Sequence, residues 1–207
     1  NVYNDTNGLV GDDIVNGTGT NAGGLYANLV NGSGNVVASV AVSGGGVYTF
    51  GTAQGVTVST TYTIILTTAA QTPGNALSVA TLPAGWVSTG ENLGAGAGND
   101  GLPANSILSV TTGLAGTNVT NANFGIEQRP TAGSGTNEAV NPGGTTNVTV
   151  PANTFTNITL SSDIAPGNVA YIRITAFPSN CTSITINGNN YTSGSFPGPG
   201  VVVPADV

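Results

Sequence analysis

The chain has 207 residues, of which nine are acidic, two are arginine and none is lysine or histidine. Two cations cannot neutralise a run of phosphates, so this balance argues against a nucleic acid partner and against a polybasic membrane contact. A chain with no histidine and one cysteine cannot build a Ser-His-Asp triad or a typical zinc site. Hydrophobic residues make up 39% of the chain, which predicts a folded protein, because disordered segments combine low hydrophobicity with high charge.

The first part of the chain predicts short β-strands separated by glycine-rich turns. Helix formers such as Lys and Met are absent, whereas apolar residues alternate with polar ones. Tyr62, Ile64 and Leu66, for example, share one face of the run Thr61–Thr67. The other candidate strands before residue 130 are Leu25–Val30, Val36–Val42, Val47–Phe50, Leu77–Thr81, Ser106–Thr111 and Val119–Phe124. Strands of this length and spacing are typical of an antiparallel sandwich.

A linker-like stretch at 130–144 divides this part from a second set of strands. The later candidates are Thr145–Val150, Phe155–Leu160, Val169–Phe177, Ser183–Asn187 and Val201–Val203. The predicted fold is therefore all-β, with two tandem immunoglobulin-like or prealbumin-like antiparallel β-sandwich domains at 1–129 and 145–207. About five strands fall short of the usual seven of an immunoglobulin-like sandwich, so we expect the second domain to be incomplete.

Several short segments of the first 130 residues occur in an order that resembles a known family. They are Val2–Gly8, Val36–Ser39, Gly46–Phe50 and Thr61–Thr63, followed by Leu82–Glu91 and Asn123–Pro130. The first four resemble the serine-aspartate-repeat adhesin B-type family, which is close to the collagen-adhesin B-type modules. The last two are similar to modules in large secreted proteins of Bacteroidota-type bacteria, and 131–207 resembles tandem immunoglobulin-like modules. The resemblance implies a prealbumin-like sandwich in an extracellular adhesin, stalk or fibre.

The sequence departs from this family where covalent joints are made. Without lysine, neither an intramolecular Lys–Asn isopeptide bond nor a lysine-based pilin linkage can form. Leu82–Gly85 and Leu102–Asn105 only begin like a Leu-Pro-x-Thr-Gly anchor. A fibre of this chain would need noncovalent joints, and an incomplete sandwich has open edges that favour strand addition. The Val2–Tyr3 region, the Val201–Val203 tail and the linker are the candidate donor segments.

Four polar residues near the start of the chain form a candidate calcium site. Asp5, Asn7, Asp12 and Asp13 lie within nine positions beside two glycines, and calcium prefers six to eight oxygen ligands. The resemblance also implies calcium at an Asp-x-Asn loop, although Leu9 occupies the place of an expected acid. The alternative is that these side chains only cap a turn. No cofactor is required by this reading, and calcium is the one candidate.

Glu91, Asp100 and Glu127 are the carboxylic acids in the middle of the chain that could act in acid–base catalysis. Glycoside hydrolysis needs two carboxyl groups roughly 5–9.5 Å apart, and nothing in the spacing brings any pair together. The expectation is that all three are solvated surface acids, as isolated Asp and Glu usually are. The protein is therefore not predicted to be an enzyme.

Trp86 and Cys181 are the only residues of their types. The Trp86 indole is a candidate for stacking on a sugar, with the alternative that it fills the core of a sandwich. Cys181 is expected to be a small buried hydrophobic residue, because no base is available to activate its thiol.

Eight Asn-x-Ser/Thr motifs make glycosylation a candidate modification for an extracellular protein. Their asparagines are Asn4, Asn16, Asn31, Asn118, Asn147, Asn157, Asn180 and Asn190. In so Asn- and Thr-rich a chain, however, chance alone produces most of such a count.

Two functions remain open at this stage, and both are placed outside the cell or on the bacterial cell surface. The first is a structural subunit or stalk of a pilus-like fibre or adhesin, with copies of the same chain as partners. The alternative is a module of a larger secreted protein that binds surface glycans or proteins. No apolar run of 18 residues and no signal peptide are present, so we expect a mature soluble segment with no direct membrane insertion.

Overall fold

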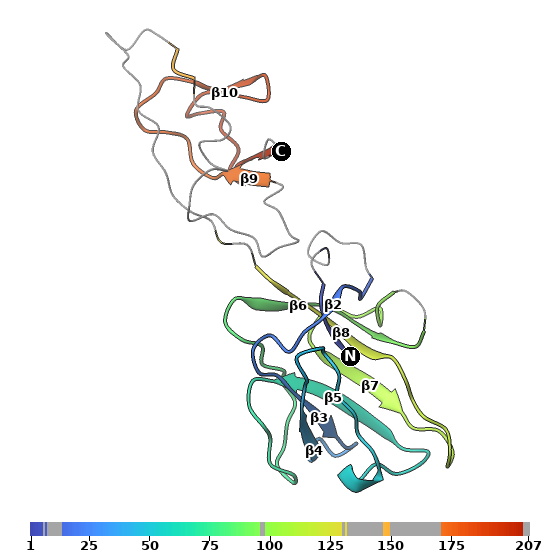
Figure 1. Cartoon of the computed structure of the whole chain (residues 1–207). Coiled ribbons are helices and arrows are strands. Elements are labelled where there is room, and N and C mark those ends of the chain that lie inside the picture. Colours follow the sequence, from blue (N-terminus) through green and yellow to red (C-terminus); the bar gives the residue numbers. More distant parts are fainter. Residues whose placement is uncertain are drawn as a thin grey trace. The chain divides into compact units, whose positions relative to one another are not determined.

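The computed structural model describes residues 1–5, 7, 14–95, 98–129, 131, 147–149 and 171–204 (Figure 1). Within these ranges the chain is mostly β-structure in several sheets, with no α-helix and one short 3-10 helix, η2, at Thr52–Gln54. The chain divides into two compact units, Asn1–Arg129 and Pro130–Val207, and each is considered by itself.

The first unit contains two four-stranded sheets, with strand orders β2-β1-β8-β6 and β4-β3-β5-β7. The strands are β1 Val2–Asn4, β2 Thr18–Gly19, β3 Tyr26–Val30, β4 Val36–Ala41, β5 Thr61–Thr67, β6 Trp86–Leu93, β7 Ile107–Thr111 and β8 Ala122–Gln128. The predictions for β3, β4, β5 and β7 are confirmed to within one residue at either end. Alternation identified these strands because each directs a row of apolar side chains into the core.

The core of the first unit lies between its two sheets. Leu66 on β5 is fully buried, as the alternating pattern predicted. Val2 on β1 and Phe124 and Ile126 on β8 belong to the same hydrophobic cluster, although their strands lie in the other sheet. Since both sheets contribute to one cluster, they pack face to face.

The first sheet is mixed, whereas the sequence predicted antiparallel pairing throughout. β1 pairs with β8 in the parallel direction, with Val2 opposite Phe124 and Asn4 opposite Ile126. β1 pairs antiparallel with β2 on its other side. Alternation reports which face of a strand is buried but carries no information on strand direction, so this pairing could not be read from the sequence.

Two predicted strands of the first unit are instead irregular segments. In Val47–Phe50, Tyr48 and Phe50 still pack against the main core, and Tyr48 donates a 2.7 Å hydrogen bond to the Ala122 carbonyl. Leu77–Thr81 covers the outer face of the second sheet, where Leu77 joins a second small hydrophobic cluster. Both segments bury apolar side chains without forming a ladder, which explains why their sequences resemble strands.

The described part of the second unit forms two two-stranded antiparallel sheets. One sheet pairs β9 Tyr171–Ile174 with β12 Val201–Pro204, and the other pairs β10 Ile184–Ile186 with β11 Asn189–Tyr191. Asn187 and Gly188 connect β10 to β11 with φ of 50° and 77°, as a tight hairpin turn requires. The strands predicted at 145–150 and 155–160 lie largely outside the described residues, so a second sandwich stays a prediction.

Candidate functional site

The outer face of the first sheet carries a small polar cluster around Gly125. Thr89 on β6 donates a 2.8 Å hydrogen bond to Asp5 Oδ2, and Asp5 is buried. A Cβ atom at Gly125 would overlap both Thr89 Oγ1 and Asp5 Oδ2. Glycine at this β8 position therefore leaves the space in which the Asp5 carboxyl group meets β6.

The predicted calcium ligands are described only in part. Asp5 is buried and Asn7 is exposed, whereas Asp12 and Asp13 lie outside the described residues. Nowhere in the described ranges do three or more His, Cys, Asp or Glu side chains gather as metal ligands would. The calcium site accordingly remains a prediction that rests on the sequence.

Glu91 on β6 is fully buried, which corrects the prediction that it is a solvated surface acid. Its Oε1 accepts hydrogen bonds from Ser88 Oγ at 2.7 Å, from the Asn105 N–H at 3.0 Å and from the Ser106 N–H. Asn105 and Ser106 lead into β7 of the second sheet. The Glu91 carboxyl group therefore fastens the two sheets together along their β6 and β7 edges.

Burial raises the pKa of Glu91 above its ordinary value of 4.5. The hydrogen bonds from Ser88, Ser106 and Asn105 lower the pKa and so oppose this shift. The negative charge of Asp100 raises the pKa by a smaller amount. Glu91 Oε2 is buried and has no hydrogen-bond partner among the residues that the structure describes. A raised pKa can mark a catalytic acid, but structural networks produce the same shift.

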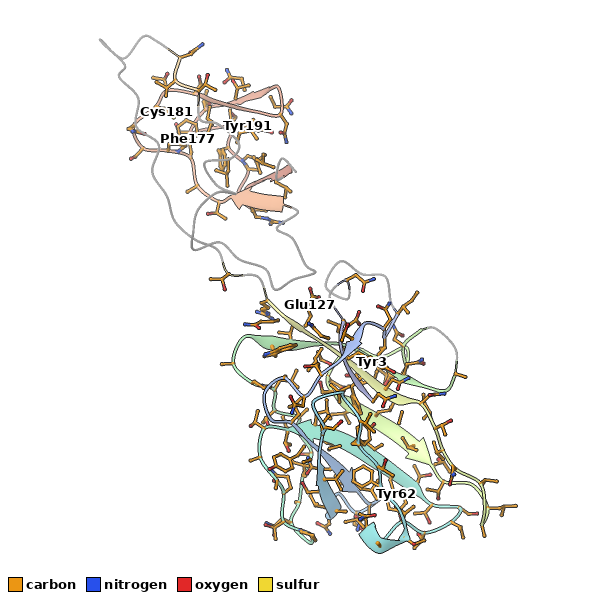
Figure 2. All side chains as sticks on the ribbon, in the orientation of Figure 1. Tyr3, Tyr62, Glu127, Phe177, Cys181 and Tyr191 are labelled. Atoms are coloured by element: carbon orange, nitrogen blue, oxygen red, sulfur yellow. The ribbon has the colours of Figure 1, made fainter. Side chains whose placement is uncertain are left out.

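Glu91 and Glu127 lie on opposite faces of the first sheet. Glu91 is opposite Phe124, whose side chain lies in the core. Glu127 follows the core residue Ile126 on β8, and successive side chains of a strand point to opposite faces. Glu127 is also buried, which again corrects the expectation of a surface acid (Figure 2). With the sheet between them, these two carboxyl groups cannot act on one glycosidic bond.

Asp100 is half-buried, and its Oδ1 accepts a 3.0 Å hydrogen bond from the Leu102 N–H. The neighbouring Asn99 Oδ1 accepts one of 2.8 Å from the Gly101 N–H. Both are Asx-type contacts, which are typical of turns. In its described surroundings the Asp100 carboxylate thus stabilises a loop.

Trp86 is half-buried and packs against the main core of the first unit, which agrees with the alternative of a core role. Cys181, however, is exposed, and the prediction of a buried cysteine is wrong (Figure 2). Its Sγ lies 3.7 Å from the Pro178 carbonyl oxygen in a loop between β9 and β10. The loop around Cys181 contributes no buried hydrophobic side chain among those described, so the cysteine has no core to enter.

The predicted glycosylation asparagines differ in exposure. Asn118, Asn147, Asn180 and Asn190 are exposed, Asn4, Asn16 and Asn31 are half-buried, and Asn157 lies outside the described residues. Asn4 belongs to β1, which has a partner strand on either side. The Asn31 Oδ1 accepts bonds from the Ser33 and Asn35 N–H groups and so caps the β3–β4 turn. The exposed four are the sterically accessible acceptors.

Comparisons of the chain with family models, with characterised proteins and with solved structures find no match. Among the described residues, no helix has the length and apolar character needed to span a bilayer.

Proposed function

We propose that this protein is a structural subunit or stalk module of an extracellular bacterial fibre or adhesin. Its units would be immunoglobulin-like or prealbumin-like sandwiches that assemble with copies of the same chain through noncovalent β-contacts. The observation that carries the proposal is the parallel pairing of β1 with β8.

Parallel first and last strands place the two ends of the first unit at opposite ends of its sheet. Val2 lies beside Phe124 near the start of β8, and β8 then runs on to Gln128 and the second unit. At about 3.3 Å per residue, the seven residues of β8 span roughly 20 Å. A unit that is entered at one end and left at the other extends a chain along one direction, as a stalk requires.

The chemistry of the described residues also supports a structural role. The buried acids make bonds that hold strands together, as Glu91 does between the sheets and Asp5 does beneath Thr89. Such groups stabilise a fold without needing a substrate. The chain also has few charges, so contacts between copies bring few like charges directly together.

Negative-stain electron microscopy of the native material tests this proposal. We expect ordered filaments or elongated stalks with an axial repeat, dissociating only under conditions that also unfold the β-structure. Isolated monomers that bind glycans on an array would contradict the proposal and favour the binding-module alternative.

A further inference from the structure

The two sheets of the first unit have four edge strands, and three of them carry at least one feature that hinders pairing with another chain. β2 has only two residues. β4 is covered at its start by 74–77, where the Val36 N–H bonds the Asn75 carbonyl at 2.8 Å and the Leu77 N–H bonds the Gly34 carbonyl at 2.9 Å. β6 has a bulge between Ser88 and Gly90 and carries the inward-facing Glu91. Short strands, coverage, bulges and inward charges are the usual devices that block edge pairing.

β7 has none of these devices. It is a regular strand of five residues that pairs with β5 without a register shift. Its side chains alternate, with Leu108 and Val110 in the core and Ser109 and Thr111 exposed. No charged residue occurs anywhere between positions 101 and 126. β7 is therefore an open edge along its whole length in the described part of this unit, whereas β4 is covered at its start.

The ladder shows which backbone groups β7 presents. Leu66 donates to the Ser106 carbonyl and Thr112 donates to the Thr60 carbonyl, so the even-numbered positions bond toward β5. In an antiparallel ladder the alternate residues then direct their N–H and C=O groups away from that partner. These residues are Ile107, Ser109 and Thr111. The Ile107 N–H bonds Asn105 Oδ1, and no described residue bonds the other outward backbone groups of the three.

We propose that β7 is a pairing surface for β7 of a second copy of this chain, so that the second sheets of two copies join edge to edge. A two-fold axis beside Ser109 sets Ser109 opposite its own copy and Ile107 opposite Thr111 of the second copy. In this register the residues that would hydrogen-bond to the partner strand are those whose N–H and C=O groups point outward. The strand is thus self-complementary, which is what a symmetric contact requires.

Side chains and charge favour the same occupant. On the outer face, the branched side chains of Ile107 and Thr111 would form cross-strand pairs, which stabilise antiparallel sheets. On the inner face Leu108 of one copy would meet Val110 of the other and extend the core. Because each copy carries a net charge of −7 but none on this segment, added salt should strengthen the pair by screening the distant acids. The inference rests on the proposed function and gives it a lateral contact.

Ser109 provides the test, because its N–H does not bond β5. Ser109→Pro removes only an outward donor, as proline at a sheet edge should. Ser109→Lys places two like charges opposite each other at the axis, and Ser109→Thr is the matched control that keeps the N–H. Sedimentation equilibrium of the full chain should show a dimer for wild type and Ser109→Thr. Losing the two central hydrogen bonds should weaken the pair by about tenfold or more in Ser109→Pro.

Circular dichroism shows whether each variant is folded. If Ser109→Pro does not fold, Ser109→Lys still tests the contact. Amide hydrogen exchange at position 109 and at Thr111 should slow with rising protein concentration in the wild type. In Ser109→Lys it should not change with concentration. A wild-type chain that stays monomeric, or a folded Ser109→Lys variant that dimerises as wild type does, overturns the inference. Filaments that persist in Ser109→Lys would overturn only the lateral contact, whereas absence of filaments in wild type would overturn the proposed function.

Discussion

The described parts of the two units differ in how they bury apolar surface. In the first, strands of up to eight residues from two facing sheets place Leu66 and Phe124 in one cluster. In the second, the described strands have three or four residues, and Ile186 is the only buried hydrophobic residue among the side chains described there. The difference teaches that strand length matters as much as alternation, because a three-residue strand presents one or two side chains to each face.

The described part of the second unit contains a group of half-buried aromatic rings. The Phe196 ring makes edge-on contacts with Phe177 and with Tyr191, at centroid distances of 6.1 Å and 5.9 Å. Such pairs contribute about 0.5–1.5 kcal/mol each beyond the area they bury. We therefore expect mutations in the first unit to have the larger effects on stability.

The largest effect is expected from Phe124→Ala, which empties a fully buried position between the sheets. Loss of a buried phenylalanine costs about 3–5 kcal/mol of unfolding free energy. Urea unfolding followed by Trp86 fluorescence measures this unit alone, because Trp86 is the sole tryptophan and packs on the same core. Val47→Ala, at a side chain 52% exposed, is the control and should change stability by less than about 0.5 kcal/mol. Equal effects would contradict a core centred on Phe124.

A smaller loss is expected from Gly125→Ala, on the polar outer face of the same strand. The added methyl group would overlap Asp5 Oδ2 and Thr89 Oγ1, and overpacking of this kind costs about 1–3 kcal/mol. Gly32→Ala is the matched control, because a Cβ there meets nothing within 4 Å. The same fluorescence-detected unfolding compares the two. If Gly125→Ala matched its control, Asp5 would not be fixed beneath Thr89 as the structure places it.

Sequence patterns predicted the strands that direct alternate apolar side chains into the core, and failed where another constraint decided the structure. Thr61–Thr67 was predicted with the bounds that β5 has, since Tyr62, Ile64 and Leu66 point into the core. β6 was missed because Trp86–Leu93 has no apolar alternation and contains a bulge. Its place in the sheet depends on pairing with β8, which lies far away in sequence.

The candidate site was harder to predict than the fold. Glu91 and Glu127 are buried although isolated acids are usually solvated, and only the three-dimensional positions of Ser88, Asn105 and Ser106 explain the burial of Glu91. A signal existed in the serine and asparagine residues flanking it on the chain, but their convergence depends on how β6 and the start of β7 meet. Long-range partners of this kind leave no periodic trace in a sequence.

Glu91→Gln should alter the pH dependence of the first unit rather than abolish its fold. Because burial raises the pKa of Glu91, the folded chain favours the neutral form. That stabilisation is complete below the ordinary value of 4.5 and is lost as pH rises through the folded pKa. Glutamine keeps the acceptor oxygen but does not titrate, so the variant should lose this decline with pH. Asp100→Asn, which removes the smaller cause of the shift, should reduce the decline in part. An unchanged profile in both variants would contradict a raised pKa.

The smallest effect on stability is expected from chemical labelling of Cys181. The rate of this labelling also probes the second unit directly. This thiol is exposed in the folded chain, so a thiol reagent should label it at nearly the rate found in urea, and labelling should leave the Trp86-detected transition unchanged. Phe124→Ala should not alter that rate, because the two residues belong to different compact units. The matched reference is Ala27→Cys in a Cys181→Ser background, since Ala27 is fully buried between the sheets and a thiol there should react only on unfolding. If Cys181 were protected as strongly as that buried thiol, the second unit would have a core at this loop, and the contrast between the two units would fail.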